Sequence, residues 1–164
     1  MASAPLALTV RAAQSGDRDT IIEFNALLAS ETEGKTLDHS VLAVGVDAAL
    51  ADPERLRYWV AVAAGQVVAQ AAVTREWSDW RNGWIWWFQS VYVRPDSRGR
   101  GVFRMIYEQI RREALAAHDV IGLRLYVDDT NTRAQQTYRS MGMKPGGYHV
   151  YEDLWTERFE NAGR

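Results

Sequence analysis

The fold is decided by residues 84–104, which read Trp84-Ile-Trp-Trp-Phe-Gln-Ser-Val-Tyr-Val-Arg-Pro-Asp-Ser-Arg-Gly-Arg-Gly-Val-Phe-Arg104. The stretch from Trp84 to Val93 is almost entirely apolar, which is typical of a strand buried on both faces. Pro95 ends the strand, and a glycine-rich loop then leads into a helix with one apolar stripe. This order predicts an anion site, because the first N–H groups of a helix lack partners and the helix dipole adds partial positive charge.

A phosphate is the natural ligand of this loop. Its glycines let the backbone approach closely, and Arg98, Arg100 and Arg104 add positive charges suited to phosphate. The loop has no Gly-Lys-Ser or Gly-Lys-Thr and does not follow Gly-x-Gly-x-x-Gly, so neither a P-loop NTPase nor a dinucleotide-binding fold is favoured. Taken alone, the segment could equally be a solvated structural turn.

The rest of the chain is expected to form one α/β domain over residues 1–164. Strands are predicted at residues 6–11, 58–63, 66–75, 84–93, 123–127 and 148–155. Helices are predicted from Gly16 to near Glu31, from Asp38 to just before Pro53, after Gly101, and from Asn131 to Met141. Short turns are expected at Ala64-Gly65 and Asn82-Gly83. We find no repeat and no linker that would divide the chain.

The composition and charge of the chain argue against several classes of function. The 164 residues are 47% hydrophobic and 24% charged, as in an ordinary globular protein, and their net charge of −2 favours neither nucleic acid nor an anionic membrane. With no cysteine, disulfides, thiolate metal clusters and a cysteine nucleophile are excluded. The three histidines lack metal-site spacing. No secretion signal or membrane span is seen, so we expect a cytoplasmic protein.

Val91-Tyr-Val-Arg-Pro-Asp-Ser-Arg-Gly-Arg-Gly-Val102 resembles the acetyl-CoA-binding motif of the GNAT family of N-acetyltransferases. In that motif Arg or Gln, two residues, Gly, one residue, and then Gly or Ala hold the pyrophosphate, and Arg98 and Gly101 match it. Phe103 departs from it, because the family prefers a small residue there. A second match lies downstream, where Leu125-Tyr-Val127, Asn131, Ala134, Tyr138 and Gly142 are similar to the strand and helix that close over the pantetheine arm.

The resemblance implies a single-domain, GNAT-like acyl-CoA N-acyltransferase fold, with a mixed, mainly antiparallel central sheet flanked by helices. The cofactor-binding core would span about residues 84–145, and acetyl-CoA would be the co-substrate without a metal. The residues that the resemblance places at the cofactor are Val91, Tyr92, Val93, Arg98, Gly99, Arg100, Gly101, Val102, Phe103, Arg104, Asn131 and Tyr138.

Catalysis would need a deprotonated amine, a stabilised oxyanion and protonation of the departing thiolate. The resemblance gives the last role to Tyr138. Many family members carry a base as a Glu where this chain has Gln89 and Ser90, so another carboxylate or water must serve. Glu31 and Glu33 are the favoured candidates, on the acceptor side. Glu76 and Asp79, near the tryptophans, are weaker ones.

Five of the seven tryptophans are Trp77, Trp80, Trp84, Trp86 and Trp87. We expect most of them in the core and one or two in a pocket for an organic cation. The expected function is direct acetyl transfer to a primary amine of a small molecule or peptide. The alternatives are a non-catalytic acyl-CoA-binding or regulatory module of the same fold and, less favoured, a nucleic-acid-binding domain. A homodimer is left open.

Overall fold

The structure is a computed structural model that describes residues 7–155. Along the chain the elements are β1 (Leu8–Ala12), η1 (Ser15–Asp17), α1 (Arg18–Glu33), α2 (His39–Ala51), β2 (Arg57–Ala63), β3 (Gln66–Ser78), β4 (Gly83–Val93), η2 (Pro95–Ser97), α3 (Val102–Ala116), β5 (Val120–Leu125) and α4 (Thr132–Ser140). They belong to two compact units, Met1–Tyr126 and Val127–Arg164, and each unit is described by itself.

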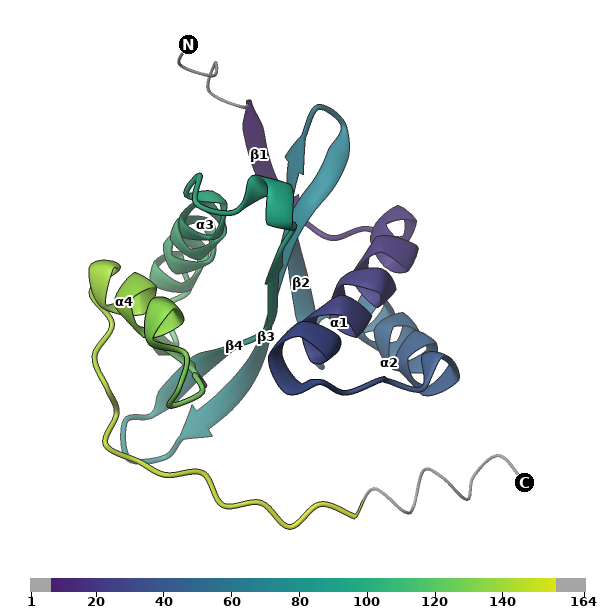
Figure 1. Cartoon of the computed structure of the whole chain (residues 1–164). Coiled ribbons are helices and arrows are strands. Elements are labelled where there is room, and N and C mark those ends of the chain that lie inside the picture. The colour runs from purple at the N-terminus through teal and green to yellow at the C-terminus, as the bar shows by residue number, and fades with distance from the viewer. Residues whose placement is uncertain (1–6, 156–164) are drawn as a thin grey trace. The chain divides into compact units, whose positions relative to one another are not determined.

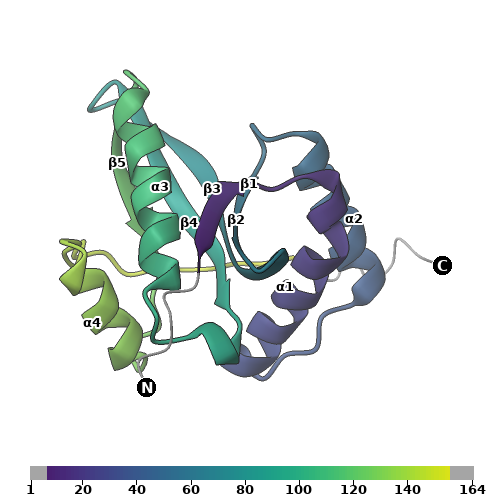
Figure 2. The ribbon, with the colours of Figure 1, turned by 90° about the horizontal axis from the view of Figure 1, so that it is seen from above.

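The first unit is built on one sheet with strand order β1-β2-β3-β4-β5. The first four strands pair antiparallel, whereas β5 pairs parallel to β4. A parallel pair needs a crossover, and α3 supplies it. Helices α1 and α2 lie over one face of the sheet and α3 over the other (Figures 1 and 2). The prediction of a mixed, mainly antiparallel sheet flanked by helices is therefore confirmed.

Two tight turns set the hairpins. Ala64 and Gly65 have φ of 49° and 77°, the left-handed pair that suits the twist of a two-residue hairpin. At the second turn Asn82 has φ of 48°. There Gly83 is required by space, because a Cβ on it would lie 2.5 Å from Cγ2 of Ile121. The predicted turn at Ala64-Gly65 is confirmed. The second turn, expected at Asn82-Gly83, lies at residues 79–82, because Gly83 already pairs with Ser78 as the first residue of β4.

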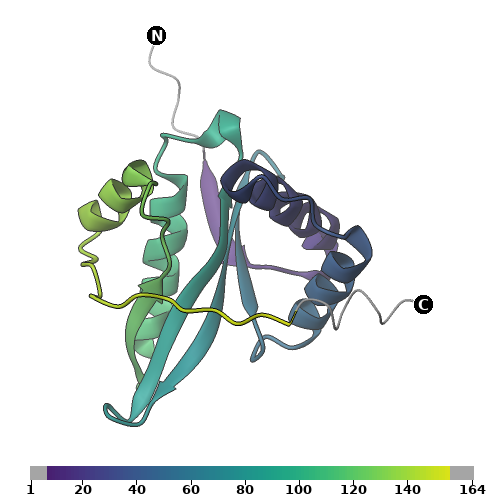
Figure 3. The ribbon, with the colours of Figure 1, turned by 60° about the horizontal axis from the view of Figure 1, so that its bottom comes forward.

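Each face of the sheet buries its own core. Beneath α1 and α2 the buried cluster is Ile21, Ile22, Val46, Ala49, Tyr58 and Ala72. On the α3 face the largest buried side chain is Trp59, which is 1% exposed and whose Nε1 donates to Glu113 Oε1 at 3.0 Å. The hairpin of β3 and β4 continues past the end of β2, where Arg57 pairs with Val73 (Figure 3). Burial of the two apolar faces is the main stabilising term.

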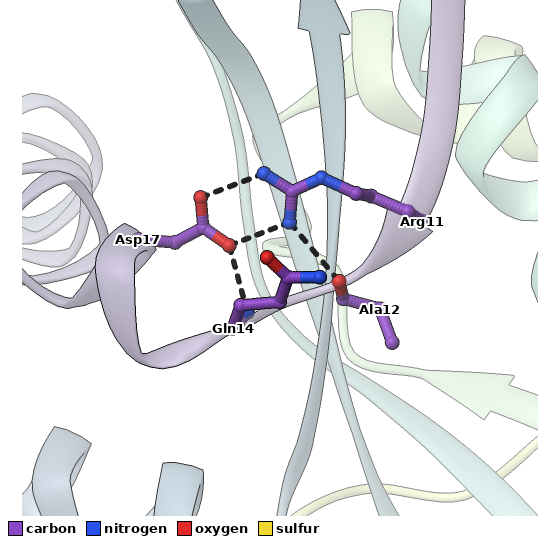
Figure 4. Close-up of polar contacts among 4 residues, drawn as sticks. All are labelled: Arg11, Ala12, Gln14 and Asp17. Carbon is purple, nitrogen blue, oxygen red and sulfur yellow. Dashed lines mark hydrogen bonds and ion pairs between the residues drawn. The ribbon is translucent and has the colours of Figure 1, made fainter.

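An ion pair ties β1 to the start of α1 (Figure 4). Arg11 donates through both terminal nitrogens to Asp17, at 2.7 and 2.9 Å, and the Gln14 N–H donates to the same carboxylate at 2.7 Å. Asp17 is 6% exposed. The Arg11 guanidinium is the main cause that holds the pKa of this carboxyl below its ordinary value of 3.8, against the effect of burial.

The second unit contains α4. Asn131 caps it, since its side-chain oxygen accepts from the Ala134 N–H at 3.0 Å, as the predicted helix start requires. Gly142 follows the helix with φ of 88°.

In the first unit, the predicted cap of α2 is also confirmed, because Asp38 accepts from the N–H groups of Ser40 and Val41.

The predicted strand at residues 148–155 is wrong, because the structure has no helix or strand there. Alternating apolar residues show which side chains suit a sheet, but a strand also needs a neighbour to pair with.

Two other predicted strands differ from the structure in their bounds. The strand expected at residues 123–127 lies at Val120–Leu125, and Leu6 of the first predicted strand lies outside the described residues. Among residues 7–155 no helix has the length and apolar character to cross a membrane.

The Arg11–Asp17 pair predicts a specific dependence of stability on pH. Because the folded pKa of Asp17 is depressed, its contribution is fully present above the unfolded value and is lost as pH falls through the lower folded pKa. Asp17→Asn should therefore lower the free energy of unfolding by about 1–2 kcal/mol at pH 7, since Arg11 stays half-exposed and solvated.

Urea denaturation from pH 7 to pH 2.5 measures this effect. The gap between the wild type and Asp17→Asn should close below about pH 4. Asp19→Asn is the matched control, because that side chain is 92% exposed, and it should change stability by less than about 0.5 kcal/mol. A gap that stays constant down to pH 2.5 would contradict the assignment.

Candidate functional site

A distortion in β4 shapes the candidate site. Gln70 of β3 pairs with Tyr92 and Ala72 with Gln89, so two residues of β4 stand opposite one residue of β3. Ser90 lies in this bulge with φ of 49°, a left-handed conformation that is strained for a residue other than glycine. The bulge separates the tryptophan-rich half of β4 from Val91, Tyr92 and Val93.

Buried amides hold the bulge in place. Gln70 is fully buried, and its Nε2 donates to Asn25 Oδ1 at 2.8 Å and to the Ser90 carbonyl at 3.2 Å. Asn25 in turn donates to the Tyr58 hydroxyl at 3.0 Å. The network joins α1, β2 and β3 to the bulge, and sequence reasoning missed it. The available signal was one glutamine inside the apolar run of residues 67–73.

The end of β4 meets the C-terminal end of α1 through a charged contact. The Tyr92 ring packs 4.9 Å from that of Phe24, and its hydroxyl donates to Glu31 Oε1 at 3.1 Å. Arg98 donates to Glu31 Oε2 at 2.6 Å and to the Val93 carbonyl at 2.8 Å. Burial, followed by the Glu31 carboxylate, raises the pKa of the Tyr92 phenol. The structure thus brings together three predicted site residues: Glu31, Tyr92 and Arg98.

The loop after β4 has the geometry that an anion site needs. Gly99 and Gly101 have φ of 74° and 75°, and a Cβ on either would meet no atom within 4 Å. Gly101 is the N-cap of α3 and has no side chain to bond the first N–H groups of the helix. Arg100 and Arg104 are exposed beside it. The open approach, left-handed glycines and exposed arginines fit a pyrophosphate such as that of acetyl-CoA.

Phe103, the departure from the family pattern, packs into an aromatic cluster. Its ring lies 6.2 Å from that of Phe88 and 6.4 Å from that of Tyr107, which itself stacks on Phe88 at 5.6 Å. These contacts place the ring between α3 and the sheet. Val102 beside it is 3% exposed.

Two of the predicted site residues, Asn131 and Tyr138, belong to the second unit. The Asn131 side chain caps α4, as described above. Tyr138 lies on the same helix and is half-buried, and burial raises the pKa of its phenol. A phenol with a raised pKa keeps its proton throughout the neutral range, so Tyr138 is suited to donate a hydrogen bond or proton.

The other candidate carboxylates have separate contacts. Glu33 ends α1 and pairs with Lys35 at 2.5 Å. Glu76 accepts from the Trp87 indole N–H and, at 3.4 Å, from Arg124. Asp79 accepts from the backbone N–H of the next residue. Glu31 is therefore the carboxylate that contacts the Tyr92–Arg98 pair. Within residues 7–155 no group of three or more His, Asp or Glu side chains is arranged to hold a metal.

The prediction that most of the five tryptophans lie in the core is wrong. Trp77 and Trp80 are 46% and 87% exposed, and Trp84, Trp86 and Trp87 are half-buried. The reason is that they lie on the part of the hairpin that continues beyond β2. Strand alternation assigns a face to each residue but does not show where the covering layer ends.

Both a protein family and solved structures match this chain. Residues 23–143 match the acetyltransferase (GNAT) family. A structure described as a possible acetyltransferase from Clostridium difficile 630 is 43% identical, with a TM-score of 0.83 over 90% of this chain and 97% of that one. A second, described as a predicted acetyltransferase with acetyl-CoA, from Clostridium acetobutylicum, is 19% identical, with a TM-score of 0.73 over 90% and 96% of the two chains.

A third structure, described as a transcriptional regulator from Bacillus halodurans C-125, is 18% identical with a TM-score of 0.75, over 90% of this chain and 99% of that one. The last two likenesses show the fold alone. No curated protein matches the sequence. The family match, however, covers most of the chain and includes β4, the glycine loop and α4. The chain belongs to the GNAT family of acetyltransferases.

Proposed function

We propose that the protein transfers an acetyl group from acetyl-CoA directly to a primary amine of an acceptor. The observation that carries this proposal is the loop between β4 and α3, where left-handed Gly99 and Gly101 leave the uncapped start of a helix open beside exposed arginines. The two compact units would act as one N-acetyltransferase domain, with its cofactor-binding core at about residues 84–145.

The proposed cofactor site uses the residues that the family motif predicts. Acetyl-CoA supplies an activated acetyl thioester when it is bound. Gly99 and Gly101 give the pyrophosphate access to the backbone, and Arg100 and Arg104 add charge. Val91, Tyr92 and Val93 offer backbone groups beside the bulge for the pantetheine amides. Val102 and Phe103 support the start of α3, and Asn131 and Tyr138 belong to the side that closes over the arm.

The contacts of Glu31 and Glu33 support different parts for them on the acceptor side. Both oxygens of Glu31 are used, one by Tyr92 and one by Arg98, so Glu31 orients the loop arginine. Glu33 is 56% exposed and its ion-pair partner Lys35 is 68% exposed, so an ammonium group of the acceptor can reach this carboxylate and compete with the lysine for it. Water then removes the proton from the amine before transfer.

The first test is binding and turnover. Calorimetric titration should show binding of acetyl-CoA and of desulfo-CoA but not of ATP. Arg100→Ala should weaken acetyl-CoA binding about tenfold, because a charged contact to phosphate is worth about 1.4 kcal/mol. Arg111→Ala is the matched control, since it is an exposed arginine further along α3.

A thiol-release assay with a panel of amines then separates the two function classes. Release that depends on an amine supports the transferase. Binding of acetyl-CoA without release for any amine would favour the non-catalytic acyl-CoA-binding module instead. Failure of the wild type to bind acetyl-CoA would overturn both.

A second prediction concerns Tyr138. Tyr138→Phe should lower kcat by about ten- to a hundredfold and change the Kd of acetyl-CoA less than twofold, because only the proton donor to the thiolate is removed. Since burial raises the pKa of this phenol, the wild type should keep activity to alkaline pH and lose it as pH rises through that pKa. Equal losses in kcat and affinity would show that Tyr138 only binds.

A third prediction separates the two glutamates. Glu31→Gln should weaken acetyl-CoA binding about three- to tenfold with kcat within twofold, because Arg98 must then be ordered on binding. Glu33→Gln should leave that Kd unchanged and raise KM for the amine. Steady-state kinetics and calorimetry measure both. A large fall in kcat for Glu31→Gln at unchanged Kd would instead identify Glu31 as the base.

A further inference from the structure

A polar and aromatic patch lies on the face of the sheet opposite α3. Phe88 packs against Tyr107 of α3, so strand alternation turns Trp87 to the other face. Arg124 of β5 pairs with Trp87 and therefore shares that face. Glu76 of β3 joins them, because it accepts from the Trp87 indole N–H and lies 3.4 Å from Nη1 of Arg124. Three neighbouring strands thus bring together a ring, a cation and a carboxylate.

This patch lies beside the point where β4 and β5 part. Their pairing ends one residue after Trp87, and the bulge at Ser90 follows two residues further along. The proposed cofactor site assigns the pyrophosphate to residues 99–101 and the pantetheine arm to residues 91–93. The reacting end of acetyl-CoA then belongs near the bulge. Because Trp87 and Ser90 are about 10 Å apart along the strand, the acceptor amine must react within reach of the patch.

Arg124 is held in the way that recognition of an anion requires. Its guanidinium lies 5.7 Å from the centre of the Trp87 ring, and Nη1 is its contact to Glu76. The side chain is 34% exposed, and among residues 7–155 its other guanidinium nitrogens have no ion-pair partner. An arginine that is stacked on a ring and anchored at one nitrogen keeps its remaining donors oriented toward an oxyanion. The Tyr126 ring, 4.5 Å from that of Trp87 and 60% exposed, adds apolar surface next to it.

We propose that Arg124 selects the acceptor, and that the acceptor is an amine with a carboxylate at the other end of a short carbon chain. The inference rests on the proposed acetyl transfer, because that function defines where the amine must lie. An amine and a carboxylate on one carbon atom are too close together to reach both the bulge and Arg124. A chain of about four or five methylene groups spans them, and its methylenes can lie on the Tyr126 ring.

The charges around Arg124 favour a carboxylate over other groups. Glu76 already neutralises part of the guanidinium charge and would repel the second negative charge of a phosphate. A second ammonium group on the acceptor is not favoured either, because Arg124 itself lies over the Trp87 ring. One added negative charge would leave the patch with one cation between two carboxylates, which its exposure to water allows.

A thiol-release assay with acetyl-CoA and a series of small amines measures this selection in the wild type. The series is glycine, γ-aminobutyrate, δ-aminovalerate and ε-aminocaproate, with ε-aminocaproamide as the uncharged match and aminopropyl phosphate as the phosphate. The kcat/KM should rise from glycine to a maximum at δ-aminovalerate or ε-aminocaproate. It should be about tenfold higher for ε-aminocaproate than for its amide, because one charge-assisted contact is lost in the amide. Aminopropyl phosphate should be a poorer acceptor than γ-aminobutyrate, which has the same number of methylene groups.

Arg124→Gln tests the residue. It should raise KM for ε-aminocaproate about tenfold, keep kcat within twofold and leave KM for ε-aminocaproamide unchanged, because the arginine binds the carboxylate and not the reacting amine. Arg75→Gln is the matched control. Arg75 is also stacked on a tryptophan, 4.8 Å from the Trp84 ring, and paired with a glutamate, but its pairing with Trp86 places it on the opposite face. This variant should leave both KM values unchanged.

The outcomes separate this proposal from the proposed function. A wild type that binds no acetyl-CoA, or releases no thiol with any amine, overturns acetyl transfer itself. Thiol release that is as efficient with ε-aminocaproamide as with ε-aminocaproate leaves acetyl transfer intact and overturns the role of Arg124. So does a preference for glycine or for the phosphate, or release only with amines that lack a carboxylate. Equal KM shifts in Arg124→Gln and Arg75→Gln would show a structural effect and also overturn it. The wild-type series decides alone if Arg124→Gln does not fold.

Discussion

The hydrogen bond from Gln70 to the Ser90 carbonyl is the contact on which the candidate site depends. It holds a left-handed residue that would otherwise cost on the order of 1 kcal/mol or more. The bulge at Ser90 shifts the alternation of β4 by one residue, so Phe88 packs toward α3 whereas Tyr92 packs toward α1. In a regular strand both side chains would share one face, and Tyr92 could not reach Glu31.

A chain of contacts links the bulge in β4 to the loop that follows this strand. Tyr92 orients Glu31, Glu31 orients Arg98, and Arg98 also bonds the Val93 carbonyl at the end of the strand. A half-exposed ion pair alone would add little stability. Here, however, it fixes one end of a loop whose glycines adopt left-handed conformations, and an ordered loop loses less entropy when it binds an anion.

The sequence predicted the features that depend on local chemistry. Ala64-Gly65, the Asp38 cap and the glycine-rich loop from Arg98 to Gly101 are examples, because a turn, a cap and a left-handed backbone each favour particular residues at fixed positions. Features that depend on distant neighbours were missed or wrong. Gln70 makes sense only with its partner on α1, and the alternating pattern of residues 148–155 does not specify the neighbouring strand that pairing requires.

The tryptophan-rich half of β4 shows why aromatic residues alone do not indicate a cation pocket. The Arg75 guanidinium lies 4.8 Å from the Trp84 ring and that of Arg124 lies 5.7 Å from the Trp87 ring. A substrate ammonium would have to displace these arginines, for a contact worth about 0.5–2 kcal/mol. These two rings are therefore already occupied by arginines of the chain itself, which counts against them as the cation pocket expected from the sequence.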